Sequence, residues 1–121
     1  KEKESAREAL RNAAKAQAQE LKLPELEGTE KQVNWALVIR KQMLRRYEAK
    51  ANNAKLILDR IEEAKHAYET QNKELIAQLE AMTDEQRAQL EIIEKEQKAI
   101  LDRYNKILTT TSAKWFIENR P

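Results

Sequence analysis

His66 is the only histidine in the 121-residue chain, and it stands three residues after Glu63. A carboxylate and an imidazole at this spacing share one face of a helix, as they do in the di-iron sites of carboxylate-rich helical bundles. Such a site needs a second Glu–x–x–His pair, which a chain with one histidine lacks. One glycine is also too few for a phosphate-binding loop. We therefore predict a solvated pair, no metal, no cofactor and no enzymatic activity.

The stretch from Gln32 to Tyr47 has a second unusual composition, because five successive apolar residues precede a dense group of cations. Residues 40–55 carry six cations and one anion, whereas residues 56–108 carry eight cations and twelve anions. Tryptophan and arginine dominate binding hot spots, and cationic side chains bond carboxylates and phosphates. The pattern predicts a partner-binding surface made of Trp35, Val38, Arg40, Lys41, Arg45, Arg46 and Lys50.

Helical geometry separates Trp35 and Val38 from the core-facing side of the same helix. At 100° per residue, that core-facing side comprises Val33, Ala36, Met43, Leu44, Tyr47 and Ala51, with Leu37 and Ile39 at its margins. Trp35 and Val38 thus form an apolar patch outside this core-facing side. Three interpretations of the patch stay open: burial by the chain itself, pairing with a second copy, or docking of another macromolecule. The cations likewise have two interpretations, a solvated helix face or contact with an anionic partner such as a protein groove or nucleic-acid phosphates.

The composition predicts an all-α protein in a single domain, since the chain has one glycine, two prolines and no cysteine. Two Thr–x–x–Gln capping boxes, starting at Thr29 and Thr83, mark helix starts. Ser112 is a further candidate cap, and Pro24 and Gly28 interrupt the chain before the first box. We predict helices over residues 2–22, 30–82, 84–108 and 113–119.

Apolar residues recur at heptad spacing on both sides of Thr83, which is typical of an antiparallel coiled coil. We predict a seam between residues 54–82 and 86–108, in which Leu75 meets Leu90 or Ile93. The N-terminal helix then covers the first half of the long central helix, and Trp115 and Phe116 arrive opposite residues 47–51. The expected architecture is an elongated antiparallel helical hairpin with a long central helix, an N-terminal helix and a short C-terminal helix.

No segment is long and apolar enough to cross a membrane, and no signal peptide is visible. The absence of cysteine is compatible with a reducing cytosol, so we expect a cytoplasmic protein without membrane association. The chain begins with Lys1 rather than methionine, so we expect that further residues precede Lys1.

Two short motifs remain. The first is Gly28-Thr29-Glu30-Lys31-Gln32 followed by Trp35-Ala36 and Ile39-Arg40, and the second is Ala113-Lys114-Trp115-Phe116-Ile117 with Arg120. They resemble a family of small helical proteins carried by phages, plasmids and integrative elements of Firmicutes. Phe116 stands where the family has a second tryptophan, and Glu118 stands where it has aspartate. We expect this family to include an anti-CRISPR inhibitor of the type II RNA-guided DNA nuclease. The resemblance implies no catalytic residues.

The resemblance thus implies a non-enzymatic mobile-element protein that binds a guide-loaded CRISPR nuclease in a bacterial host. Two alternatives stay open: a structural coiled-coil adaptor of a phage or plasmid assembly, and a weak, sequence-independent nucleic-acid binder with phosphate contacts. Either the acidic hairpin or the basic segment 40–55 makes the contact. A homodimer is a further expected assembly, because rod-like helical proteins with an uncovered face often pair by two-fold symmetry.

Overall fold

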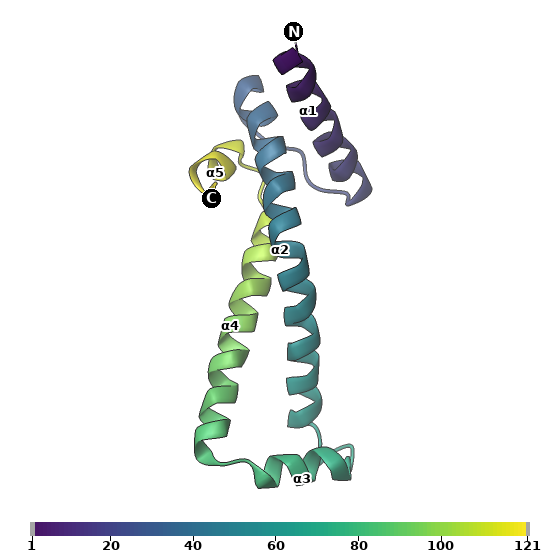
Figure 1. Cartoon of the computed structure of the whole chain (residues 1–121), viewed down its shortest axis with the longest axis vertical. Helices are drawn as coiled ribbons and strands as arrows, with labels where there is room; N and C mark the ends of the chain where they lie inside the picture. The colour runs from purple at the N-terminus through teal and green to yellow at the C-terminus, as the bar shows by residue number, and fades with distance from the viewer. Residues whose placement is uncertain (1, 121) are drawn as a thin grey trace. The chain divides into compact units, whose positions relative to one another are not determined.

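The computed structural model describes residues 2–120 and shows an all-α protein (Figure 1). Its helices are α1 (Glu2–Glu20), α2 (Glu30–Lys65), α3 (Lys73–Ala81), α4 (Asp84–Thr109) and α5 (Ala113–Glu118). The predicted fold class is therefore confirmed. The chain forms two compact units: unit 1 contains the residues up to Glu48 and those from Tyr104 onward, and unit 2 contains Ala49–Arg103.

Both predicted capping boxes form, and both start helices. The Thr29 N–H donates to Gln32 Oε1 at 3.1 Å, and the Gln32 N–H donates to Thr29 Oγ1 at 3.2 Å. Thr83 and Gln86 make the same pair of bonds at 2.9 and 3.2 Å. Each box satisfies two backbone donors that the first turn of a helix leaves unpaired. Ser112 Oγ accepts from the Trp115 N–H at 3.2 Å and caps α5 as expected.

The prediction of one helix over residues 30–82 is wrong, because α2 ends at Lys65 and α3 follows after a turn. The backbone of Gln71 takes a φ of 55°, and the Asn72 N–H reaches back to the Ala67 carbonyl at 2.9 Å. This is the closure that glycine usually provides at helix ends. Asn72 then accepts from the Leu75 N–H at 3.2 Å and caps α3. Gln71 consequently lies in a turn rather than in a helical seam.

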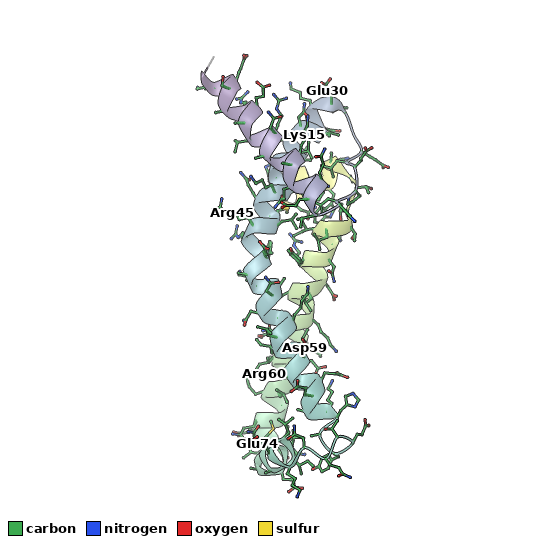
Figure 2. The ribbon with its side chains drawn as sticks, turned by 90° about the vertical axis from the view of Figure 1, so that its right-hand side faces the viewer. Lys15, Glu30, Arg45, Asp59, Arg60 and Glu74 are labelled. Carbon is green, nitrogen blue, oxygen red and sulfur yellow. The ribbon has the colours of Figure 1, made fainter. Side chains whose placement is uncertain are left out.

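The core of unit 1 forms where α2, the end of α4 and α5 meet. Its largest fully buried side chains are Met43, Leu44, Ile107 and Phe116. Ala36 and Ile39 complete the α2 side of this cluster, so the predicted core-facing side of α2 is confirmed. α1 lies along the first half of α2 in both views (Figures 1 and 2). Its one buried residue among those whose side chains are described is Ala14.

The position of α5 differs from the prediction that it lies opposite residues 47–51. The Glu27 N–H donates to the Thr111 carbonyl at 2.6 Å, and the Ala113 N–H donates to the Glu27 carbonyl at 3.0 Å. These bonds fix the start of α5 beside the linker that precedes α2. The linker turns at Gly28, whose φ of 150° is a conformation that favours glycine.

Unit 2 contains the second half of α2, the whole of α3 and most of α4. α2 and α4 run antiparallel, as predicted, and Glu94 of α4 accepts bonds from Lys65 of α2 at 2.7 Å and from Lys98 at 3.0 Å. The bonds to these two ammonium groups lower the pKa of the Glu94 carboxyl, and the bond to Glu94 raises the pKa of Lys65. α3 lies across, between the end of α2 and the start of α4 (Figure 1). The predicted continuous seam is therefore interrupted.

Candidate interaction surface

Trp35 lies outside the core of unit 1, with 48% of its surface exposed. The Arg120 guanidinium lies 4.9 Å from the centre of the indole ring, a cation–π contact within the chain. Arg120 also donates to the Ile117 carbonyl at the end of α5. The sequence predicts the exposed position of Trp35 but gives no indication of this contact. Trp35 is therefore accessible and contacts one cationic side chain of its own chain.

Four more of the predicted site residues in unit 1 extend this exposed region along α2. Arg45 and Arg46 are exposed, and Val38 and Lys41 are half-buried. Arg46, eleven residues after Trp35, returns to nearly the same angular position because eleven residues span close to three turns, whereas Arg45 lies about 80° from Trp35 around the helix. Arg45 projects outward from α2 (Figure 2). We refer to Trp35, Val38, Lys41, Arg45 and Arg46 as the Trp35 surface. Lys50 is exposed but belongs to unit 2, so the Trp35 surface does not include it.

Arg40 is a correction to the predicted site, because its side chain is buried and only 2% exposed. Its Nη1 atom donates to the Pro24 carbonyl at 2.9 Å, and this burial lowers the pKa of the guanidinium. Arg40 follows the buried Ala36 by four residues, which places it on the core side of α2. That spacing is visible in the sequence, so the helical position of Arg40, rather than its charge, indicates that its side chain is buried.

Arg40→Ala is expected to destabilise the protein by about 2 kcal/mol, because it removes a packed aliphatic stem and leaves the Pro24 carbonyl without its donor. Urea denaturation followed by circular dichroism measures this loss. Arg45→Ala is the matched control, since the same truncation at an exposed position is expected to change stability by less than about 0.5 kcal/mol. Equal losses for the two variants would contradict the structural role of Arg40.

A groove opens beside the Trp35 surface, between the first half of α1 and the start of α2. Its volume is about 1160 Å³, and Leu10 on α1 remains 50% exposed there. Residues 3–10 are all exposed, so α1 covers α2 only through its second half. The groove is lined by Glu4, Arg7, Glu8, Leu10, Arg11, Thr29, Lys31, Gln32, Asn34, Trp35, Val38 and Ile117. The chain itself therefore buries the apolar patch of Trp35 and Val38 only in part.

His66 does not pair with Glu63. Its Nε2 and Nδ1 atoms lie 2.9 Å from carboxylate oxygens of Glu62 and Glu69, respectively. The bond to Glu69, and then that to Glu62, raises the pKa of the exposed imidazole. Within residues 2–120, no group of three or more acidic or histidine side chains is arranged to hold a metal ion. No described helix is long and apolar enough to span a bilayer.

The fold defines an all-α protein built on an antiparallel helical hairpin, with a mixed apolar and cationic surface on α2. Comparison of the chain with protein-family models, characterised proteins and solved structures gives no match. The family resemblance of the two short motifs therefore stays a prediction, and the functional argument rests on the surface itself.

Proposed function

We propose that the protein is a non-enzymatic binding protein that uses the Trp35 surface to bind and cover a site on a partner macromolecule. The observation that supports this most directly is that Trp35 is half-exposed on α2, the helix that also carries the exposed Arg45 and Arg46. The opposite face is filled by the chain's own core. A large aromatic ring flanked by arginines is the combination that interface hot spots favour.

The partner that the motif resemblance supports is the guide-loaded RNA-guided DNA nuclease of a type II CRISPR system. In this proposal the chain acts as an anti-CRISPR protein in the bacterial cytoplasm and inhibits stoichiometrically, by covering a surface. Arg45 and Arg46 form charge-assisted bonds with carboxylates of the nuclease or with phosphates of its guide. Trp35 supplies the apolar anchor.

Trp35→Ala is expected to weaken binding to the guide-loaded nuclease by about 2 kcal/mol or more, roughly a thirtyfold rise in Kd. The melting temperature should change little, because the exposed contact with Arg120 contributes only about 0.5–1 kcal/mol. Calorimetry of binding and thermal denaturation test both parts. Leu56→Ala is the control, since Leu56 is 65% exposed, belongs to unit 2 and is not part of the Trp35 surface.

A lowered melting temperature in Trp35→Ala, together with unchanged affinity of Arg45→Ala and Arg46→Ala, would mean that Trp35 belongs to the core. Failure of the unmodified protein to bind the nuclease would reject that partner.

The exposed arginines also favour a second candidate, a sequence-independent nucleic-acid binder. Affinity for bare RNA that falls steeply with salt concentration would support that candidate. Binding to a capsid or tail component instead would identify a structural adaptor.

A further inference from the structure

The imidazole in the turn between α2 and α3 contacts a carboxylate through each of its ring nitrogens. Glu62 belongs to the last turn of α2, His66 is the first residue after that helix, and Glu69 lies further along the turn. His66 Nε2 lies 2.9 Å from Glu62 Oε1, and His66 Nδ1 lies 2.9 Å from Glu69 Oε2. One side chain therefore bridges the end of α2 and the segment that leads to α3.

Both hydrogen bonds exist together only when the imidazole is protonated. An ionised carboxylate only accepts hydrogen bonds, and a neutral imidazole carries a single N–H. In the neutral ring, one nitrogen would present its lone pair to a carboxylate oxygen, and that bond would be lost. The bonds to Glu69 and then to Glu62 accordingly raise the pKa of His66.

The charged surroundings of the ring are simple. Within residues 2–120, Glu62 and Glu69 are the charged side chains that contact it, and none of the contacts comes from α3. Glu94 of α4 faces this end of α2, but it bonds Lys65 at 2.7 Å instead. The chain has one histidine and no cysteine, so no other side chain has an ordinary pKa between about 5 and 8.

α3 is held weakly enough for these two bonds to matter. It contains no buried residue, and a helix of nine residues is marginal in water without packing. The Gln71 backbone before it has a φ of 55°, a left-handed conformation that side chains disfavour. Exposed ion pairs contribute little to a rigid structure, but the free energy needed to open such a segment is itself small. A change in two exposed bonds therefore changes how often this segment opens.

We infer that protonated His66 fastens the α2–α3 turn, and that loss of this proton makes opening of the turn and of α3 more frequent. The folded turn binds the proton more tightly than the open turn, as the raised pKa of His66 indicates. The stabilisation by the charged ring is therefore complete below about pH 6.5, the ordinary pKa of histidine, and is lost as the pH rises through the raised pKa of the folded protein.

The groove of unit 2 depends on this turn. α3 contributes Leu75 and Leu79 to a groove of about 920 Å³ that it forms with α2 and α4. Each opening of α3 moves these two apolar side chains away from the groove that they line. This behaviour is confined to unit 2 and is independent of the function proposed for the Trp35 surface.

Amide hydrogen exchange followed by NMR, at pH values between about 5.5 and 8.5, tests the inference. The Asn72 and Ile76 amides bond the Ala67 and Asn72 carbonyls, respectively, and report on the turn and the start of α3. Corrected for intrinsic exchange, their protection is expected to fall about two- to fivefold as His66 loses its proton, the range that exposed ion pairs give. The Leu44 amide, in the core of unit 1, should keep its protection.

Glu69→Gln and Glu62→Gln are each expected to lower the pKa of His66, measured from its ring NMR signals, and to reduce the pH dependence of exchange. Glu63→Gln is the matched control, because Glu63 precedes His66 by three residues but does not bond the ring. This variant should behave like the unmodified protein. His66→Ala should show, at every pH, protection no higher than that of the unmodified protein at high pH.

Circular dichroism verifies that the variants remain folded. Protection of the turn and of α3 that stays constant with pH in the unmodified protein, or that still varies with pH in His66→Ala, would overturn the inference. An effect of Glu63→Gln as large as that of Glu69→Gln would overturn it too, because the two bonds to the ring would then not be the cause.

Discussion

Phe116→Ala is expected to lower the free energy of unfolding by about 3–5 kcal/mol, the usual cost of removing a fully buried phenylalanine. Phe116 has no exposed surface and packs in one cluster with Met43 and Ile107. Its ring meets the Trp115 ring edge to face, with 5.0 Å between the centroids. A domain of this size is typically stable by 5–15 kcal/mol, so the variant should lose much of its native population. Urea denaturation measures the loss.

Phe116→Leu is the matched control for that prediction, because it retains most of the apolar volume and should lose clearly less than the alanine variant. Truncating an exposed residue of the same helix, Lys114→Ala, should cost less than about 0.5 kcal/mol. If Phe116→Ala were as mild as Lys114→Ala, α5 would have to lie outside the core of unit 1.

Gly28→Ala is expected to cost about 2–3 kcal/mol, the second largest effect. The residue has a φ of 150°, where side chains other than hydrogen are strained. A methyl group there would approach Gln32 Oε1 to 2.9 Å and the Ala113 Cβ to 3.2 Å. The first contact disturbs the capping box of α2, and the second pushes on the start of α5. Thermal and urea denaturation report the loss.

Thr29→Ala separates the two causes, since it removes the capping hydroxyl without straining the backbone and should cost only about 1 kcal/mol. A loss in Gly28→Ala no larger than that of Thr29→Ala would show that the capping box accounts for the whole effect. The conformation of Gly28 and its contact with Ala113 would then contribute nothing.

Local sequence signals predicted the starts of α2, α4 and α5 and the core side of α2, but not the start of α3, because these signals depend on residues within two turns of one another. The Thr–x–x–Gln boxes and the periodic apolar side of α2 are of this kind. The break between α2 and α3 was missed because the turn after Lys65 closes at Gln71 in a left-handed conformation, where glycine is expected. The position of α5 was missed because it depends on backbone bonds between Glu27 and residues more than eighty positions later.

The exposed positions of the candidate surface could also be predicted from local signals, with Arg40 as the exception. Exposure of Trp35, Arg45 and Arg46 follows from their angular positions on a single helix, and the structure agrees. Arg40 was misassigned because a positive charge outweighed its helical position, although a carbonyl from the linker can satisfy a buried guanidinium. The groove of unit 2 was not predicted, because it exists only once α3 turns across the other two helices.

The division of unit 1 between two distant stretches of chain has a consequence for synthesis on the ribosome. Residues up to Glu48 emerge well before Ile107, Ala113 and Phe116, which complete their core. Unit 2 is continuous in sequence, so its helices are available for pairing while the apolar side of α2 in unit 1 still lacks its cover. The nascent chain therefore exposes Ile39, Met43 and Leu44 until Ile107, Ala113 and Phe116 have been made, an interval in which chaperones can act. Translation arrest before residue 104 would leave that side of α2 permanently open.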